Sequence, residues 1–307
     1  MKNYIVIDMG GTRLKIGLFR NTQLMKCNVV ASCAQENFEN TIRIFNAEIK
    51  ALIESQNVGS ITGIGLSMPG IIDTKDNKIL SINDKYSDAV SFDLNSWAKE
   101  HWNCGLVTEN DARAALVGEW CQGAGKGINN LVIMTLGTGI GGAALIEGKL
   151  LHGKHFQAGC LGGHFCIDFR GEACNCGSKG CVETKGSSWV LPNLAKAGNY
   201  PVESVSFKNL FDDMRTSNKE ATDILRICMD AWSACAINLI HAYDPEMLIV
   251  GGGVMKSADI ILPEIQAWID KYAWTPWGKV IVRKAELEDT AALYGMNYLL
   301  MEQEKCE

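Results

Sequence analysis

The pattern of apolar and polar positions at the start of the chain predicts three short strands joined by tight turns. Residues 4–8 are mostly apolar and include β-branched side chains, which is typical of a buried strand. A Gly-Gly-Thr turn follows at residues 10–12, then a second strand to Phe19, a turn at residues 21–22 and a third strand. The chain therefore begins with a predicted β-meander whose first turn is rich in glycine.

The same order of elements returns near the middle of the chain. A strand is predicted from Leu131, followed by a Gly-Thr-Gly turn at residues 137–139, a strand to Ile146, a tight turn at Gly148 and a further strand. One Gly-rich turn would carry little information. Its repetition within the same arrangement of strands indicates an internal duplication.

Helical and strand-like patterns alternate through the rest of the sequence. Residues 37–56 repeat apolar side chains every three or four positions, which predicts an amphipathic helix. Another helix is expected from about Lys219 to Tyr243. Further helices are expected at residues 94–101 and from about Asp289. Strands that alternate with helices favour a mainly parallel sheet covered on both faces, so the fold class is α/β.

Two segments are less regular. Residues 61–68 are expected to form a buried strand that ends in a turn at Pro69 and Gly70, followed by a long irregular loop to about Asp93. No Pro-rich or Ser-rich linker separates the two halves, so the predicted boundary near residue 115 is a soft one.

Composition and charge exclude several classes of protein. With 307 residues and 47% apolar content, the chain is long enough for two folded domains. The 29 basic and 35 acidic residues leave a net charge of −6 without a basic run, so neither a nucleic acid nor a membrane is an expected partner. We find no leader pattern and no apolar run long enough to span a bilayer, and we expect a cytoplasmic protein whose twelve cysteines are mostly reduced.

Four potential metal ligands gather in one short stretch: His164, Cys174, Cys176 and Cys181. Thiolates and an imidazole at this spacing can close a tetrahedral Zn²⁺ site, and two glycines before the last cysteine permit a tight turn. The alternative is four unrelated buried residues. Because such clustering is rare in a reducing compartment, we favour zinc, and four protein ligands leave no position for a catalytic water, which indicates a structural site.

The two Gly/Thr turns are candidate phosphate-binding loops. Backbone N–H groups without a neighbouring Cβ can approach phosphate oxygens closely, and a threonine hydroxyl adds a donor. Asp8, directly before the first turn, is placed to hold Mg²⁺. A third glycine cluster, with Gly252 and Gly253, follows a buried strand where a nucleotide base could lie. Taken alone, either of the first two turns is better explained as a tight hairpin turn, and it is their pairing that favours phosphate binding. The third cluster could equally be a close strand-to-helix turn. The Gly and Thr residues of the first two turns are Gly10, Gly11, Thr12, Gly137, Thr138 and Gly139.

Five motifs together resemble the ROK family (repressor, open reading frame, kinase), which includes bacterial glucokinases and N-acetylhexosamine kinases. The resemblance covers about residues 4–300, and the combination of motifs is far more specific than any one of them. The motifs are DMGGT, ENDARAALVGE, LGTGIGG, GH followed by C-x-C-G-x-x-G-C-x-E, and IVGGG.

This resemblance implies an actin-like ATPase fold of the hexokinase or ribonuclease H type, with two similar α/β domains and a cleft between them. The implied domains are residues 1–115 together with about 293–307, and residues 116–292, which carry the zinc segment. Mg-ATP is expected at the two Gly/Thr turns, and a homodimer is expected by analogy. Family repressors carry an additional N-terminal helix-turn-helix domain. Because the first predicted strand begins at residue 4, we expect a kinase.

The resemblance also assigns roles at the sugar. Asp111 matches the catalytic base, which would accept a proton from the sugar hydroxyl during in-line phosphoryl transfer. From the residues alone, Asp111 could instead cap the following helix. His152 and His155 have no family role and are expected to be solvated loop residues. The implied sugar-binding residues are Gly70, Asn83, Asn110, Asp111, His164 and Glu183.

One motif departs from the family pattern. The family reads G-E-I-G-H where this chain reads GCLGGH, so the position of a sugar-binding glutamate falls on Leu161, or on Cys160 if one residue is inserted. A less polar wall changes which sugar is preferred. The expected activity is phosphorylation of a hexose, glucose or a relative, most often on the 6-hydroxyl. The alternatives are an N-acetylhexosamine kinase (N-acetylmannosamine or N-acetylglucosamine) or a catalytically silent sugar-binding regulator.

Overall fold

A computed structural model describes residues 1–33, 37–82 and 84–306. The chain divides into two compact units. The first unit comprises Met1–Gly123, His152–Ala158 and Thr290–Glu307, and the second comprises Ala124–Leu151 and Gly159–Asp289.

A five-stranded sheet forms the centre of the first unit, in the order β3-β2-β1-β4-β7. Strand β1 pairs antiparallel with β2 and parallel with β4, and β7 continues the sheet in parallel with β4. The expected meander is therefore present, and its first turn joins β1 to β2. The strands are β1 (Asn3–Met9), β2 (Arg13–Arg20), β3 (Gln23–Ala31), β4 (Gly63–Met68) and β7 (Gly105–Asn110).

The sheet of the second unit repeats this topology in the order β10-β9-β8-β11-β12. Strand β8 is antiparallel to β9 and parallel to β11, as β1 is to β2 and β4. The predicted duplication is thus confirmed at the level of strand order. The strands are β8 (Leu131–Leu136), β9 (Ile140–Ile146), β10 (Lys149–Leu150), β11 (Met247–Gly251) and β12 (Ile281–Lys284).

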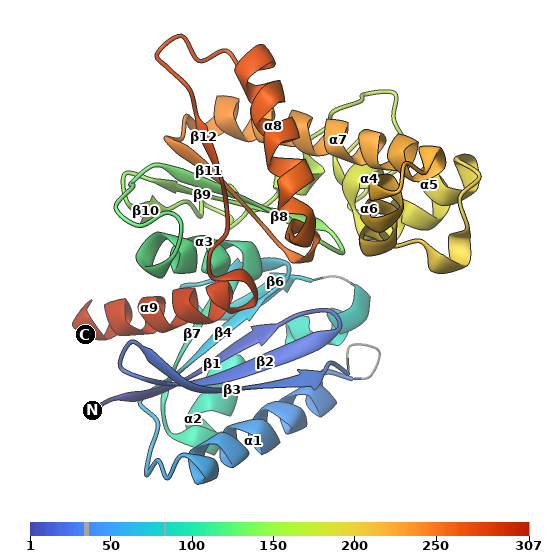
Figure 1. Cartoon of the computed structure of the whole chain (residues 1–307). Coiled ribbons are helices and arrows are strands. Elements are labelled where there is room, and N and C mark those ends of the chain that lie inside the picture. The colour runs from blue at the N-terminus through green and yellow to red at the C-terminus, as the bar shows by residue number, and fades with distance from the viewer. Residues whose placement is uncertain (34–36, 83, 307) are drawn as a thin grey trace. The chain divides into compact units, whose positions relative to one another are not determined.

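Helices cover both faces of the first sheet (Figure 1). Ile5 and Ile7 of β1 belong to a core shared with α1 and α2, whereas Tyr4 and Val6 belong to a core shared with α3 and α9. Because successive strand residues point to opposite faces, both faces of β1 must be apolar, and the unbroken apolar run at residues 4–7 meets this need. The helices are α1 (Phe38–Ser55), α2 (Leu94–Trp102), α3 (Asp111–Gln122) and α9 (Ala291–Cys306).

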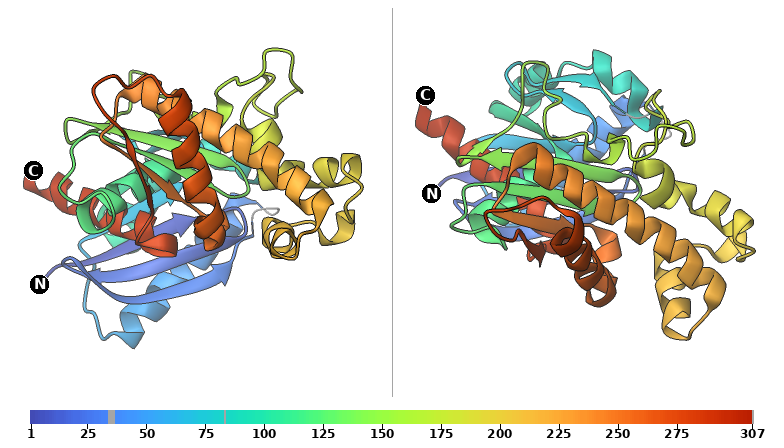
Figure 2. Two further views of the ribbon diagram at one scale, coloured as in Figure 1. Left: turned by 45° about the horizontal axis from the view of Figure 1, so that its top comes forward. Right: turned by 90° about the horizontal axis from the view of Figure 1, so that it is seen from above.

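One large apolar core joins the second sheet to its helices. The long helix α7 lies along the sheet in both views of Figure 2 and contributes the fully buried Trp232 to this core. The helices are α4 (Glu183–Gly186), α5 (Leu191–Ala197), α6 (Phe207–Arg215), α7 (Lys219–Tyr243) and α8 (Ala258–Tyr272). The short 3₁₀ segments are η1 (Asp84–Ser91), η2 (Gly162–His164), η3 (Ser188–Val190), η4 (Val202–Ser204), η5 (Gly253–Ser257) and η6 (Glu288–Thr290).

The prediction of a long irregular loop after Gly70 is wrong. The segment contains the antiparallel hairpin β5 (Ile71–Asp73) and β6 (Lys78–Ser81), followed by η1. Ile72 and Ile79 are buried in the core of the unit. Strands of three and four residues offer too few positions for an alternating pattern to stand out, which is why no strand signal is visible in this part of the sequence.

Within the described ranges, no helix combines the length and apolarity needed to cross a bilayer. The eleven cysteines from Cys27 to Cys235 are all free thiols.

Candidate functional site

The junction of β7 and α3 positions the predicted catalytic residues. Asn110, not Asp111, is the N-cap of α3, because its Oδ1 accepts hydrogen bonds from the backbone N–H groups of Ala112 (3.1 Å) and Arg113 (3.2 Å). Its Nδ2 donates to the carbonyl oxygen of Gly70 and to Oδ1 of Asp111, both at 3.1 Å. The buried Asn110 amide therefore ties the Gly70 turn to Asp111 at the start of the helix.

Asp111 is a half-buried carboxyl group with a perturbed pKa. Burial, and then the negative charge of Asp8, raise its pKa to about 6, against hydrogen bonds from the Ala112 N–H and the Asn110 amide that favour the ionised form. At neutral pH such a group is mostly ionised, yet it binds a proton more readily than an ordinary aspartate. Asp111 therefore has the properties of a general base working near neutral pH.

Asp8 lies near the end of β1 and has a protein partner on each carboxylate oxygen. Oδ1 accepts a hydrogen bond from the Ser67 hydroxyl (2.8 Å), and Oδ2 lies 3.2 Å from the Lys15 ammonium group. Strand register explains both contacts, because Ser67 on β4 and Lys15 on β2 lie directly across from Asp8. Asp8 and Asp111 thus form a pair of neighbouring acidic groups at the carboxyl ends of strands, where α/β sheets commonly bind ligands.

The carbonyl groups of the first Gly/Thr turn are held by protein donors. The Tyr86 hydroxyl donates to the Gly10 carbonyl (3.0 Å), the Ser32 hydroxyl to that of Gly11 (3.1 Å), and the Ser32 N–H to that of Thr12 (3.1 Å). These bonds to its oxygens, together with a bond from the Gly10 N–H to the Arg13 carbonyl (3.0 Å), fix the orientation of the turn. The N–H groups of Gly11 and Thr12 are the ones suited to a phosphate.

A buried ionic cluster lies next to Asp111, and the sequence did not predict it. Glu109 accepts a 2.6 Å hydrogen bond from Nε2 of His152, and its other oxygen lies 3.5 Å from Nη1 of Arg113. Arg113 is fully buried and donates through Nη2 to the carbonyl oxygens of Phe156 (3.0 Å) and Ala158 (2.7 Å). The cluster anchors residues 152–158 to the start of α3.

The prediction that His152 is a solvated loop histidine is wrong, because its ring is bonded to a buried carboxylate. His155 is exposed, as expected. The i,i+4 spacing of Glu109 and Arg113 was a signal available in the sequence, whereas nothing there links His152 to them.

The second Gly/Thr turn, between β8 and β9, is held by a carboxylate from a distant part of the sequence. Oε1 of the buried Glu183 accepts a 2.7 Å hydrogen bond from the N–H of Ile140, the residue directly after the turn. The indole N–H of Trp189 donates to the other oxygen at 3.3 Å. A Cβ on Gly139 would lie only 2.5 Å from Oε1, so the close approach requires glycine there.

The third glycine cluster packs against the same turn. Gly252 has φ +94°, and a Cβ on it would lie 2.2 Å from the carbonyl oxygen of Leu136, which precedes Gly137. Gly253 begins η5. The structure thus brings the predicted nucleotide-binding residues of the second unit together, from the end of β8 to the end of β11.

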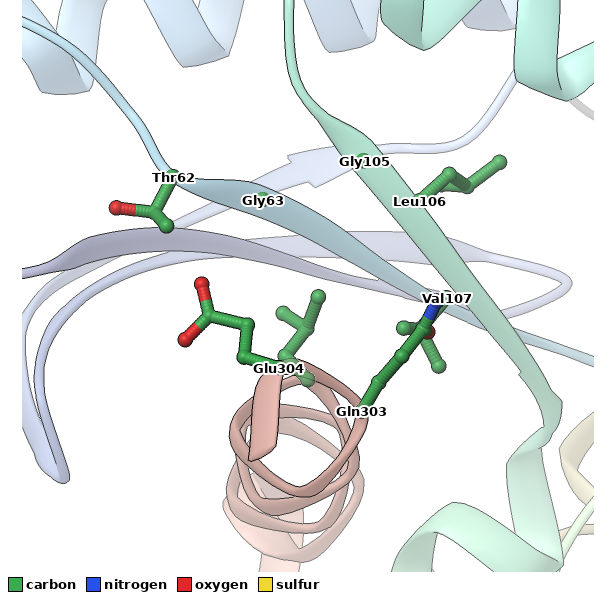
Figure 3. Close-up of a pocket in the computed structure, with 8 residues that line it drawn as sticks. Thr62, Gly63, Gly105, Leu106, Val107, Gln303 and Glu304 are labelled. Atoms are coloured by element: carbon green, nitrogen blue, oxygen red, sulfur yellow. The ribbon is translucent and has the colours of Figure 1, made fainter. Parts of the chain in front are cut away.

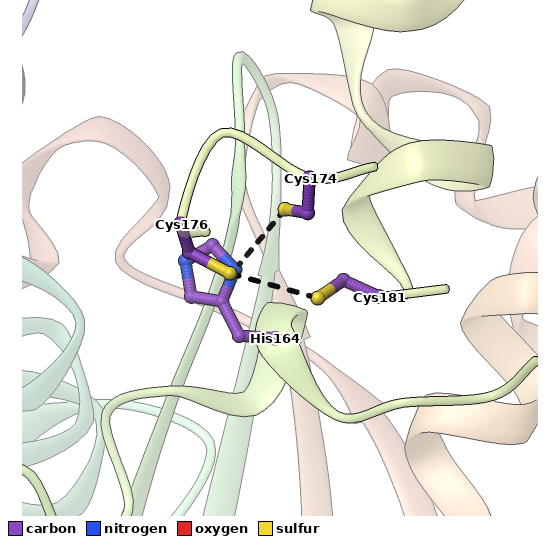
Figure 4. A group of neighbouring side chains, drawn as sticks. All are labelled: His164, Cys174, Cys176 and Cys181. Atoms are coloured by element: carbon purple, nitrogen blue, oxygen red, sulfur yellow. Dashed lines mark hydrogen bonds between the residues drawn. The ribbon is translucent and has the colours of Figure 1, made fainter. Parts of the chain in front are cut away.

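The four predicted metal ligands converge on one point (Figure 4). Their ligand atoms all lie within 4.8 Å of one another, with Cys176 Sγ 3.7 Å from Cys181 Sγ and Cys174 Sγ 3.7 Å from Nδ1 of His164. A tetrahedral Zn²⁺ with Zn–S bonds of about 2.3 Å places two sulfurs about 3.8 Å apart and a sulfur and nitrogen about 3.6 Å apart. The donor set therefore fits a tetrahedral metal ion.

Electrostatics at this cluster agree with a site for a cation. Burial raises the pKa of Cys181 to about 12, and neighbouring thiols add to the effect. Against the cost of burial, hydrogen bonds from the Ser178 N–H and the other two thiols lower the pKa of Cys176. Several thiolates in one small volume repel one another, and a bound cation removes this penalty.

Three further positions concern the sugar. Asn83, one of the predicted sugar-binding residues, lies outside the described residues. In the GCLGGH segment, Cys160 is buried and Leu161 is partly buried. Neither side chain supplies the carboxylate that the family pattern has at this point.

A small pocket of about 90 Å³ in the first unit is not part of the site (Figure 3). Its walls come from the beginnings of β4 and β7, around Gly63 and Gly105, and from the end of α9. The predicted site residues lie at the opposite, carboxyl ends of these strands. Glu304 at the pocket is bonded to the Tyr4 hydroxyl (2.6 Å) and the Lys2 ammonium group (2.8 Å), which gives this region a structural role.

Comparison with known proteins gives one family and a consistent fold. A family model described as "ROK family" matches residues 4–303. Glucokinase from Halalkalibacterium halodurans is 29% identical over 318 residues, covering 98% of this chain and 96% of the relative. The Xylose repressor of Bacillus spizizenii is 26% identical over 248 residues, covering 80% of this chain and 63% of the repressor. Sequence relatives thus include both enzymes and a regulator.

Two solved structures carry the same fold. A glucokinase from Streptomyces griseus in complex with glucose and AMPPNP is 26% identical, with a TM-score of 0.79 and coverage of 97% of this chain and 98% of that one. A putative N-acetylmannosamine kinase from Listeria monocytogenes is 23% identical, with a TM-score of 0.84 and coverage of 98% and 99%. These likenesses confirm the predicted actin-like α/β fold class.

Proposed function

The chain belongs to the ROK family, and we propose that it is an ATP-dependent sugar kinase that transfers the γ-phosphoryl group of ATP to a hydroxyl group of a hexose. One observation carries this proposal. Asp111 is half-buried beside Asp8 at the carboxyl ends of parallel strands, with its pKa raised to about 6. This is the group that proton removal from a sugar hydroxyl requires.

In the proposed mechanism, Asp111 accepts the proton of the attacking hydroxyl while the phosphoryl group moves in line from ATP to the sugar oxygen. The P–O bond to the ATP β-phosphate breaks, and ADP leaves. Asn110 acts on Asp111 directly, since its amide donates to Oδ1 at 3.1 Å and fixes the orientation of the carboxylate. Glu109, His152 and Arg113 hold the same junction from behind.

Asp8 and the two Gly/Thr turns are proposed to bind Mg-ATP. Asp8 has bonds to Ser67 and Lys15 but is partly exposed, so it can still meet a hydrated Mg²⁺ ion. The turns at Gly10–Thr12 and Gly137–Gly139 would receive the phosphates through the N–H groups of Gly11, Thr12, Thr138 and Gly139, because those of Gly10 and Gly137 are bonded within the turns. Gly252 and Gly253 would lie near the base. Mg²⁺ would offset the charge of the transferring group.

We assign a structural Zn²⁺ ion to His164, Cys174, Cys176 and Cys181. A bound ion would supply a rigid cross-link between segments that contain little regular structure of their own. Nδ1 of His164 faces the sulfurs, which leaves Nε2 on the other side of the ring to meet a sugar hydroxyl. Glu183 and the amide of Asn110 are the other proposed sugar contacts, together with Gly70 and Asn83. A cytoplasmic homodimer remains part of the proposal.

The preferred sugar depends on the GCLGGH segment. A carboxylate that accepts hydrogen bonds from sugar hydroxyls contributes about 1.5 to 3 kcal/mol per bond, and this segment has none. Glucose or a related hexose is the first candidate substrate because glucokinases are among the relatives of this chain. N-acetylmannosamine and N-acetylglucosamine are the second, because a less polar wall suits a 2-acetamido group better.

A catalytically silent sugar-binding regulator is the alternative function. The missing glutamate and the likeness to a repressor favour it, whereas the presence of Asp8, Asp111 and both turns favours the kinase.

The test is release of ADP from Mg-ATP by zinc-loaded protein with a panel of glucose, mannose, fructose, allose, N-acetylglucosamine and N-acetylmannosamine. We expect turnover with one sugar or one class of sugars. Sugar binding without any ADP release across the panel would contradict the kinase and support the regulator.

A further inference from the structure

The metal-binding segment, residues 162–189, contacts the second Gly/Thr turn at two points. Both contacts are made by residues one or two positions away from a metal ligand. Gly163 precedes His164, and a Cβ on Gly163 would lie 2.1 Å from the carbonyl oxygen of Ile140. Glu183 follows Cys181 by two residues and accepts the N–H of Ile140 at 2.7 Å. Both polar backbone groups of Ile140 thus face residues that lie one or two positions from ligands of the metal cluster.

Glu183 is itself held rigidly. The Ser187 hydroxyl donates to its backbone carbonyl at 2.6 Å, and the Trp189 indole donates to its side chain at 3.3 Å. Ser188, between these two residues, donates its N–H to the carbonyl of Gly137 at 3.1 Å. The segment that follows Cys181 therefore bonds to both ends of the Gly137–Gly139 turn. The Ser188 N–H bonds to Gly137 at one end, and the buried Glu183 carboxylate bonds to Ile140 directly after the other.

From these contacts the geometry points to Glu183 as a positioning residue for the nucleotide, through which the metal cluster fixes the phosphate-binding turn of the second unit. This inference rests on the proposed function and adds to it, because Glu183 was assigned only to the sugar. A carboxylate can accept several hydrogen bonds, so a bond to Ile140 does not prevent one to a sugar. Metal occupancy then controls affinity for ATP as well as for the sugar.

The negative charge of the Glu183 carboxylate explains why a glutamate is suited to accept the Ile140 N–H. A carboxylate accepts a backbone N–H with a charge-assisted bond, which is stronger than a bond between neutral groups. It turns this N–H away from any ligand. The Gly137 N–H donates to the Gly139 carbonyl within the turn (3.0 Å), so the N–H groups of Thr138 and Gly139 are the ones suited to phosphate. A negative charge close to a phosphate site would repel the ligand, and its burial behind the turn, bonded to Ile140 and Trp189, limits that effect.

The experiment compares three variants with wild type: Glu183→Ala, Glu183→Gln and, as control, Glu172→Ala. A glutamine can keep the bond to Ile140 through its amide oxygen, whereas alanine cannot. Glu172 lies in the same metal-binding segment but is exposed and pairs with Lys185 at 2.9 Å, away from the turn. Two quantities are measured without sugar: hydrogen exchange of the Ile140 amide, and affinity for a non-hydrolysable ATP analogue with Mg²⁺.

We expect Glu183→Ala to speed exchange of the Ile140 amide by more than about tenfold and to weaken analogue binding by a similar factor, with Glu183→Gln and Glu172→Ala within about threefold of wild type. Removing the metal from wild-type protein with a chelator should reproduce the alanine result, and added Zn²⁺ should reverse it. This arm keeps the test decisive if Glu183→Ala fails to fold.

Unchanged Ile140 exchange and analogue affinity in Glu183→Ala, with sugar affinity alone reduced, would overturn the inference and leave Glu183 a sugar ligand. A wild-type protein that binds no analogue would contradict the proposed function instead. In that case exchange at Ile140 still decides whether the metal segment holds the turn.

Discussion

The two Gly/Thr turns arise from the same strand order, yet the acidic residue beside each serves a different purpose. At the first turn, Asp8 lies on the strand that leads into the turn, is partly exposed, and raises the pKa of Asp111. At the second turn, Glu183 comes from the metal-binding segment, is buried, and accepts a backbone N–H directly after the turn. The first carboxylate places negative charge near the Asp111 carboxyl group, whereas the second holds part of the backbone in place.

The difference shows how the two copies of a duplicated unit can take on different roles. Repeating the strand–turn–strand pattern supplies two sets of N–H groups suited to phosphate. The first copy adds two neighbouring carboxyl groups, those of Asp8 and Asp111. The second copy has no acidic residue at the position of Asp8, where Met134 to Leu136 lead into the turn. Its turn is held instead by contacts with residues 162–189. Variants in the first unit should therefore change chemistry, and variants in the second should change binding.

The largest expected effect is on catalysis in the first unit. Replacing the base in Asp111→Asn should lower kcat by about 10²- to 10⁴-fold, because the amide cannot accept the proton, while nucleotide affinity stays close to wild type. Asp76→Asn, which changes an exposed aspartate of the same unit, is the matched control. The measurement is sugar-dependent ADP release together with analogue binding. Equal turnover in Asp111→Asn and wild type would remove Asp111 from the mechanism.

In the second unit, the corresponding large effect is on the metal. Metal analysis of wild type should find about one Zn²⁺ per chain, and Cys176→Ser should lose the ion and lower the midpoint of thermal unfolding. Cys166→Ser is the control, because Cys166 is an exposed thiol in the same segment and outside the ligand cluster. A disulfide at the cluster with no metal bound would show that the site has been misassigned.

Stability of the first unit should depend on its buried ionic cluster. Arg113→Ala removes the permanently charged partner of the buried Glu109, leaving His152, and removes donors from two carbonyl groups, so we expect the free energy of unfolding to fall by about 3 to 5 kcal/mol. Arg43→Ala, at an exposed position on α1, should change it by less than about 0.5 kcal/mol. Urea unfolding measures both. A small loss in Arg113→Ala would mean that the cluster contributes little.

A smaller and more local effect is expected within the second turn. Gly139→Ala would place a methyl group against the Glu183 carboxylate, whereas the space around Gly137 is open. We therefore expect Gly139→Ala to weaken ATP-analogue binding by roughly tenfold, equivalent to about 1.4 kcal/mol, and Gly137→Ala to weaken it less. Calorimetric titration compares the two. Equal affinities of Gly139→Ala and Gly137→Ala for the analogue would mean that the contact with Glu183 does not determine the conformation of the turn.

The smallest expected effect is a shift of one pKa. Because Asp111 must be ionised to act as a base, kcat/KM should fall as the pH drops below about 6. Asp8→Asn removes the nearby negative charge and should lower the pKa of Asp111, though not to the ordinary value of aspartate, since burial is the larger cause. A ¹³C NMR titration of the Asp111 carboxyl measures this without relying on activity. An upward shift would mean that the two groups are not coupled as described.

The sequence predicted the elements whose periodic pattern is long. The helix expected at residues 219–243 has these bounds in α7, and the strand-turn-strand repeats appear in both sheets. It failed for the hairpin β5–β6, whose strands are too short to show a period.

Within the site, adjacency along the chain revealed Asn110 and Asp111 because they share one motif. The partners of Asp8 could not be predicted, because Ser67 comes from another strand and its position depends on sheet register. The hydrogen bond between Ile140 and Glu183 joins residues 43 positions apart, and no local sequence pattern predicts such a bond.

The most direct test of the central claim is identification of the sugar product. Zinc-loaded protein is incubated with Mg-ATP and one sugar at a time, and the mixture is analysed by ³¹P NMR and mass spectrometry, with Asp111→Asn in parallel. The account predicts one sugar phosphate ester formed for each ADP released, with formation of both products slowed by about 10²- to 10⁴-fold in Asp111→Asn. Sugar binding without a phosphate ester, or ATP hydrolysis to free phosphate alone, would contradict it.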